Sequence, residues 1–131
     1  MDKSLQSQGE TVRRQVLGNA YVDQALGKAD DFSRPFQDVL NEYCWGMVWT
    51  DDGLDLKQRS LLNLGMLAAL GRMDEFATHF CGAIRNGLTD EELRCALIQV
   101  AVYCGVPAGV EAFRVARKAR ESMGATDSAT G

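Results

Sequence analysis

The stretch that decides the fold of this chain is Glu75-Phe-Ala-Thr-His-Phe-Cys-Gly-Ala-Ile-Arg-Asn-Gly87. Its apolar residues recur at helical spacing, at Phe76, Phe80, Ala83 and Ile84. A helix with one apolar face must bury that face against other elements. Gly87 supplies the left-handed conformation in which helices commonly end. The stretch therefore predicts a packed helix over residues 74–86.

The same helical spacing recurs on both sides of this stretch, and no alternating strand pattern of useful length occurs. With their caps, the predicted helices cover residues 10–17, 20–26, 33–47, 55–71, 74–86, 89–103 and 108–122. Capping boxes at Asp55-x-x-Gln58 and Thr89-x-x-Glu92 open two of them. The sequence thus predicts an all-α bundle of six or seven helices, with one domain over residues 10–122, a flexible segment at 1–9 and a disordered tail at 123–131.

Two of these helices carry more apolar surface than a small bundle buries. In residues 33–47, helical spacing places a buried face at Phe36, Val39, Leu40, Tyr43, Cys44 and Met47, with Trp45 and Trp49 on a flanking face. The helix over residues 55–71 is apolar around most of its circumference, so we expect it to lie centrally. Contact between copies of the chain would bury this surplus of apolar surface, so the sequence predicts a homo-oligomer.

Composition excludes several kinds of partner. The chain has 131 residues, 46% of them hydrophobic, and a net charge of -4. A negative net charge, without a run of basic residues, argues against binding to nucleic acid or to anionic lipid. No apolar stretch is long enough to span a bilayer, and residues 1–10 lack the apolar core of a secretory signal. We expect a cytoplasmic protein that binds a small molecule.

The four cysteines, Cys44, Cys81, Cys95 and Cys104, form no Cys-x-x-Cys pair, so neither a zinc site nor a dithiol motif is indicated. We expect them to be small buried apolar residues. Cys81 stands two positions after His79, and such positions on a helix point in different directions. A Cys81 nucleophile activated by His79 is therefore disfavoured.

His79 is the only histidine in the chain. Helical spacing puts its imidazole on or beside the buried face of its helix, where the surroundings can tune a group that titrates near neutrality. One reading is a proton donor or acceptor. The other is a core or interface histidine whose ring nitrogens are simply hydrogen-bonded.

Four segments in order resemble the carboxymuconolactone decarboxylase family. They are Tyr43-Cys-Trp-Gly-Met-Val-Trp49, Arg59-Ser-Leu-Leu-Asn-Leu-Gly-Met-Leu-Ala-Ala-Leu-Gly-Arg72, His79 with Gly82-Ala-Ile-Arg-Asn-Gly-Leu-Thr89, and Gln99-Val-Ala-Val-Tyr-Cys-Gly-Val-Pro107. The resemblance covers roughly residues 10–120 and implies an AhpD-like helical fold, assembled as a trimer or hexamer. Disulfide reductases of this superfamily carry Cys-x-x-Cys before the histidine, but Arg72 and Glu75 stand at those positions here, which excludes that thiol chemistry.

The resemblance implies decarboxylation of 4-carboxymuconolactone, or a similar unsaturated lactone acid, in protocatechuate (3-oxoadipate) breakdown. The lactone is itself the electron sink, so no metal or organic cofactor is expected. In this reading His79 donates the proton, Glu75 orients it and raises its pKa, and Arg59 and Arg72 hold carboxylates. Two tryptophans would wall the site and a tyrosine would stabilise an oxyanion: Trp45, Trp49 and Tyr103.

Each assignment has a plainer alternative. Arg59 and Arg72 can be solvated charges near helix ends, the tryptophans can be core or interface packing, and Glu75 can be a first-turn carboxylate. The chain also departs from close decarboxylases, which carry an arginine where Cys81 stands, and an amide where Val110 stands. Both changes make the pocket less suited to a dianionic lactone. The alternative functions are an isomerase or hydrolase acting on another carbonyl compound, and a non-catalytic oligomeric binding protein.

Overall fold

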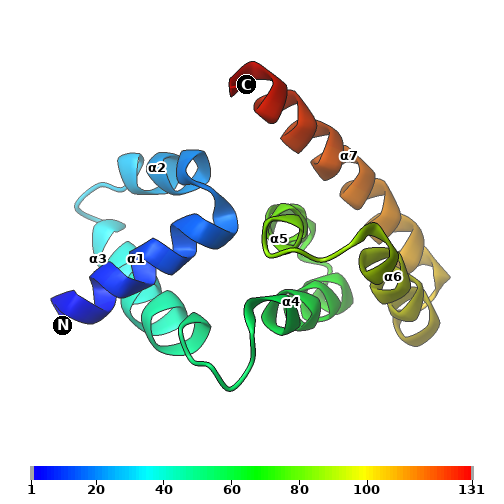
Figure 1. The fold of residues 1–131 in the computed structure, drawn as a ribbon, viewed down its shortest axis with the longest axis horizontal. Helices are drawn as coiled ribbons and strands as arrows, with labels where there is room; N and C mark the ends of the chain where they lie inside the picture. The colour runs from blue at the N-terminus through cyan, green and yellow to red at the C-terminus, as the bar shows by residue number, and fades with distance from the viewer. Residues whose placement is uncertain (1, 131) are drawn as a thin grey trace. The chain divides into compact units, whose positions relative to one another are not determined.

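The computed structural model describes the backbone of residues 2–130 and the side-chain surroundings of residues 2–124. Every regular element in this part of the chain is helical, which confirms the all-α prediction (Figure 1). The elements are α1 (Lys3–Leu17), α2 (Asn19–Gly27), α3 (Arg34–Val39), the π-helix η1 (Leu40–Trp49), α4 (Leu56–Leu70), α5 (Met73–Arg85), α6 (Asp90–Cys104) and α7 (Val106–Thr130). None of the described helices is long and apolar enough to cross a membrane.

The backbone divides into two compact units, Met1–Leu56 and Lys57–Gly131, whereas the sequence predicted one domain over residues 10–122. Each unit has an apolar core of its own. The first core contains Val16, Leu17, Val22, Trp45 and Trp49, and the second is centred on Phe76, Phe80, Leu64, Leu93 and Leu97. The division follows from these two separate clusters, because burial of apolar side chains is what makes a unit cohesive.

In the first unit the helix α1 begins at Lys3, so residues 3–9, for which we predicted a flexible segment, are helical. The carboxylate of Asp2 caps it by accepting a hydrogen bond from the Leu5 backbone nitrogen at 3.1 Å. Gly9 is buried where α1 crosses η1, and a β-carbon there would collide with the Asn41 carbonyl oxygen. This close backbone approach holds the start of α1 in place.

The exposure predicted for residues 33–47 is wrong. Phe36, Tyr43 and Met47, which we predicted to be buried, are 61%, 52% and 54% exposed, whereas the flanking residues Trp45 and Trp49 are buried. For Tyr43 and Met47 the reason is the π-helix η1, in which backbone bonds run from i to i+5 and each turn holds more residues than an α-helix; Phe36 lies before it, on α3. The wider turn rotates a different set of side chains toward the core.

In the second unit, α5 buries the face that its spacing predicts, with Phe76, Phe80 and Ala83 all inaccessible or nearly so. The helix α6 begins at the predicted capping box, in which the Thr89 hydroxyl and the Glu92 carboxylate each accept a backbone hydrogen bond from the other residue. Gly87 has φ 96°, as expected of a left-handed cap. These local signals set the length and position of α5 and α6.

Two predictions about the second unit need correction. The helix α4 fully buries only the face formed by Ser60, Leu64 and Ala68, and Leu67 packs against the same core while partly exposed. Other large apolar side chains of α4 are exposed in the unit: Leu61, Leu62, Met66 and Leu70. The helix α7 continues to Thr130, although we expected it to end near Ser122 and the tail to be disordered. No proline interrupts that segment, and a single glycine such as Gly124 weakens a helix without ending it. The side chains of residues 125–131 lie outside the described part.

Candidate active site around His79

His79 lies in the middle of α5, and its Nδ1 is 3.5 Å from the side-chain nitrogen of Asn63 on α4. An amide NH₂ group can only donate, so Nδ1 accepts and the neutral ring carries its proton on Nε2. In the neutral ring, this contact with α4 favours the tautomer whose proton is on Nε2 and directed away from Asn63. Asn63 is a site residue that the sequence analysis missed, although its place as a polar residue inside the apolar run of α4 was the available signal.

Burial lowers the pKa of His79 below its ordinary value of 6.5, and the nearby charge of Glu75 raises it by less. Glu75 therefore acts in the direction that we predicted, but desolvation of the imidazole outweighs it. The net pKa of His79 in the free protein is therefore lowered. Without bound substrate, the site holds His79 mainly as neutral imidazole near neutral pH.

Three further predicted site residues lie on or directly beside α4 and α5, the two helices that meet at His79. Arg59 is partly buried on α4, one turn before Asn63, and the i, i+4 spacing puts both on one face. Glu75 is exposed on α5, one turn before His79. Arg72 is exposed at the residue that precedes α5. Next to Arg59, the fully buried hydroxyl of Ser60 accepts a hydrogen bond from Asn86 at 2.8 Å and ties α4 to the end of α5.

Trp45 and Trp49 belong to the first unit, where they are 4% and 6% exposed. Their rings stack with centroids 4.7 Å apart and pack with Val16, Leu17 and Val22. In that unit both tryptophans are core residues, which is the alternative that the sequence analysis gave for them. Their predicted role as walls of the substrate pocket stays a prediction.

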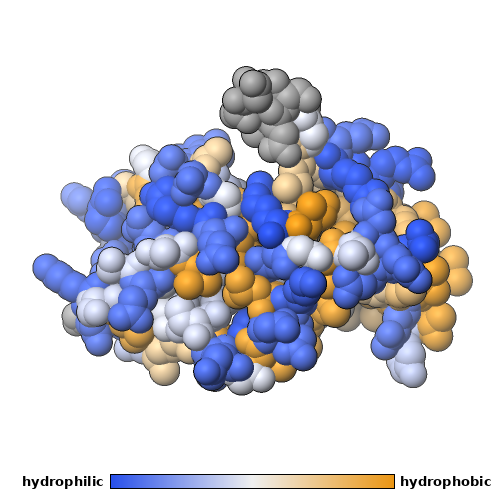
Figure 2. Space-filling model, in the orientation of Figure 1, coloured by the Kyte–Doolittle hydropathy of each residue, from blue (hydrophilic) through white to orange (hydrophobic). Residues whose placement is uncertain are grey.

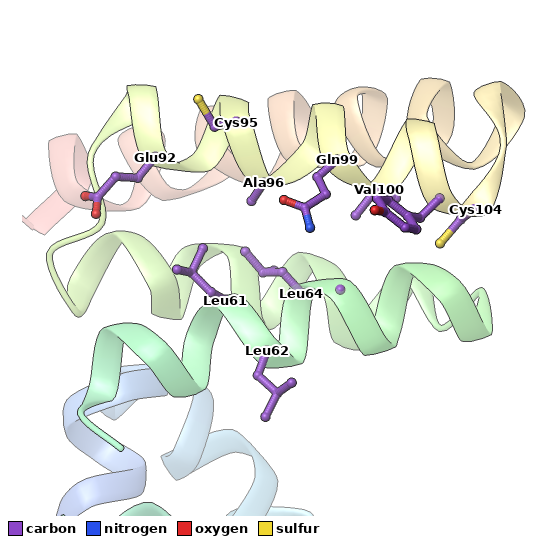
Figure 3. Close-up of a pocket in the computed structure, with 11 residues that line it drawn as sticks. Leu61, Leu62, Leu64, Glu92, Cys95, Ala96, Gln99, Val100 and Cys104 are labelled. Atoms are coloured by element: carbon purple, nitrogen blue, oxygen red, sulfur yellow. The ribbon is translucent and has the colours of Figure 1, made fainter. Parts of the chain in front are cut away.

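Tyr103 is 83% exposed on α6, and it lines a cavity of about 680 Å³ between α4 and α6. Figure 3 shows Leu61 and Leu64 of α4 pointing toward α6, and Gln99 of α6 pointing toward α4. The residues that line this cavity include neither His79 nor an arginine. The structure therefore places Tyr103 at an apolar cavity and brings no cation there to bind a carboxylate.

The cysteines are less buried than predicted. Cys44 and Cys81 are partly buried, whereas Cys95 and Cys104 are exposed on α6. The thiol of Cys81 donates to the Ala119 carbonyl oxygen of α7 at 3.5 Å, while His79 contacts α4. The two side chains thus point to different helices, as their spacing predicts. Within the described residues, no three His, Cys, Asp or Glu side chains are grouped so that they could hold a metal ion.

Comparison with known proteins gives three relatives and one family. The model of the carboxymuconolactone decarboxylase family matches residues 34–118. The chain is 44% identical to the nitrosuccinic acid decarboxylase npaB of Metarhizium robertsii, over 94% of this chain and 86% of that protein. It is 35% identical to the 4-carboxymuconolactone decarboxylase of Acinetobacter baylyi, over 94% of this chain and 92% of that protein. A 4-carboxymuconolactone decarboxylase of Pseudomonas putida is 40% identical over 45 residues.

Proposed function

The chain belongs to the carboxymuconolactone decarboxylase family and is a carboxy-lyase, and we propose that it decarboxylates a small polycarboxylic acid with His79 as the proton donor. The observation that carries the proposal is the partly buried imidazole of His79, whose Nδ1 contacts Asn63 and whose Nε2 is directed away from that contact. A desolvated acid of tunable pKa is the group that a decarboxylation of this kind requires.

The reaction needs a substrate that can accept an electron pair. The bond between a carbon atom and the departing carboxylate breaks, carbon dioxide leaves, and the electron pair moves into an adjacent sink. In 4-carboxymuconolactone the sink is the conjugated lactone carbonyl, and in nitrosuccinic acid it is the nitro group. A proton from Nε2 of His79 then forms the new carbon–hydrogen bond. Because the substrate supplies the sink, the protein has only to bind, orient and protonate.

The other residues in this unit fit the remaining roles. Arg59 shares a face of α4 with Asn63. We propose that its guanidinium group binds the substrate carboxylate that stays in the product. Arg72, which precedes α5, is the second candidate for binding this carboxylate. Glu75 raises the pKa of His79 by its charge and so favours the imidazolium that donates the proton. Tyr103 stays a proposed pocket residue, and we assign Trp45 and Trp49 to the core of the first unit. No carboxylate contact is assigned to any of the three.

Two substrates are candidates. 4-Carboxymuconolactone, in aromatic-compound breakdown, follows from the family resemblance. Nitrosuccinate is favoured by one observation: the relative that acts on it is 44% identical over nearly the whole chain. We therefore expect nitrosuccinate to be the better substrate.

The test is a direct comparison of the two acids with purified protein, following carbon dioxide release and the ultraviolet absorbance of each substrate. We expect a higher kcat/KM with nitrosuccinate. Turnover of neither acid, with no carbon dioxide released, would refute the proposed substrates.

The pH dependence follows from the lowered pKa of His79. Since the imidazolium is the donor, kcat/KM should fall as pH rises through the free-protein pKa, which lies below 6.5. An anionic substrate bound beside the ring raises that pKa, so the fall in kcat should occur at higher pH than the fall in kcat/KM. Both profiles come from initial rates between about pH 5 and 9, a range chosen to bracket an imidazole. A kcat/KM that rises across this range would instead make His79 a base.

We also propose that the protein is a cytoplasmic homo-oligomer, a trimer or hexamer. Support comes from exposed apolar side chains that the unit of α4 to α7 leaves uncovered, such as Leu70, Val102 and Val106, which are 72%, 74% and 68% exposed. Figure 2 shows hydrophobic side chains at the surface where α6 ends and α7 begins. Surfaces of this kind are typical of contacts between proteins.

A further inference from the structure

A second cavity lies between α6 and α7, on the side of α5 that carries Phe80, and it has a volume of about 360 Å³. Both long helices line it with residues at i, i+3, i+4 and i+7, so each presents one continuous face. The face of α6 begins at Asp90 and ends at Leu97. The face of α7 begins at Phe113 and ends at Arg120. The size is within the range of pockets that bind small organic molecules.

The floor of this cavity is apolar. Phe80, Leu93, Leu97 and Ala116 all line it, and each is at least 95% buried. The Arg120 guanidinium lies 5.7 Å from the centroid of the Phe80 ring and is held by Asp90, with nitrogen and oxygen 2.8 Å apart. This ion pair and the ring contact fix Arg120 at one end of the floor.

Two further arginines, Arg94 and Arg117, line the same cavity from opposite helices. Among the residues that the structure describes, neither takes part in an ion pair or a hydrogen bond. One more acid, Glu121, also lines the cavity and is likewise outside every ion pair of the described residues. Asp90 already neutralises Arg120, so the cavity keeps an excess of positive charge in a protein of net charge -4. Both arginines are exposed, so a carboxylate would be attracted by their charge and by bidentate hydrogen bonding.

We propose that this cavity is a second binding site, for a small amphipathic carboxylate. The carboxylate binds the guanidinium groups of Arg94 and Arg117, and an apolar body covers Phe80 and Leu97. A bare phosphate fits less well, because it would leave the apolar floor in water. The site is separate from His79, whose ring contacts Asn63 on α4, whereas the Phe80 ring lies under Arg120 of α7. It is therefore suited to sense an acid without consuming it.

The test is calorimetric titration of the full chain with 2-naphthoate as the probe. We expect binding to wild type, and a dissociation constant at least about tenfold higher in Arg94→Gln/Arg117→Gln, because a bidentate charged contact is lost. Lys28→Gln/Lys118→Gln is the matched control. It removes the same charge from exposed residues outside the cavity and should leave the dissociation constant unchanged. Arg117→Gln alone should give an intermediate value.

Three further titrations distinguish binding in this cavity from binding at His79 and from simple attraction between charges. The neutral 2-naphthamide should bind much more weakly than 2-naphthoate, and inorganic phosphate should not compete. His79→Ala should bind 2-naphthoate as wild type does, whatever its turnover, which keeps this test independent of the proposed reaction. The proposal is overturned by absence of binding to wild type, by equal binding in the double arginine variant, by equal binding of the amide, by competition from phosphate, or by loss of binding in His79→Ala.

Discussion

His79→Ala should lower kcat by about 10²- to 10⁴-fold, the usual contribution of a positioned proton donor. Alanine removes the Nε2 proton that the contact with Asn63 positions, and no other histidine exists in the chain to replace it. Carbon dioxide release under saturating substrate is the measurement. The variant should keep its helical circular dichroism, because the core of its unit is formed by Phe76, Phe80 and their apolar neighbours.

Thr78→Ala is the control for this change. Thr78 precedes His79 on α5, and its hydroxyl donates only to the Asp74 carbonyl one turn earlier. Its loss should leave kcat close to that of wild type. A folded His79→Ala protein with undiminished kcat would remove His79 from the reaction and return it to the alternative of a hydrogen-bonded structural histidine.

Trp45→Ala should lower the free energy of unfolding by about 3–5 kcal/mol, the typical loss for a large aromatic side chain replaced in a core. Trp45 is 4% exposed and stacks on Trp49 within the core of the first unit. Since domains are stable by only about 5–15 kcal/mol, the first unit should unfold in much less urea than in wild type. Denaturation followed by tryptophan fluorescence measures the change.

Trp45→Phe distinguishes packing from a role in the substrate pocket. Phenylalanine keeps an aromatic ring against Trp49, so the loss of stability should be clearly smaller than with alanine. We expect KM to stay at the wild-type value, because the Trp45 side chain is buried within its own unit. A raised KM in this well-folded variant would instead establish Trp45 as a pocket wall, and a loss below about 1 kcal/mol in Trp45→Ala would contradict the core role.

The helices of the second unit could largely be predicted from sequence, because the signals that set them act between residues close in the chain. The capping box at Thr89 and Glu92 and the positive φ of Gly87 depend on neighbours within one turn. The buried face of α5 follows from the spacing of Phe76, Phe80 and Ala83 alone. The same spacing predicted that His79 lies beside that face and that its side chain points in a different direction from that of Cys81.

What only the tertiary structure decided depends on contacts between distant residues. The π-helix η1 packs against α1 at Gly9 and Gly46, and it turns Trp45 rather than Tyr43 toward the core, which no α-helical period predicts. The contact between Asn63 and His79 and the joint lining of one cavity by Arg94 and Arg117 both join residues on different helices. Sequence thus determined the helices, the family and the choice of His79 as the proposed acid, whereas packing of helix on helix determined the contact of His79 with Asn63, the burial that lowers its pKa and the cavity proposed as a second anion site.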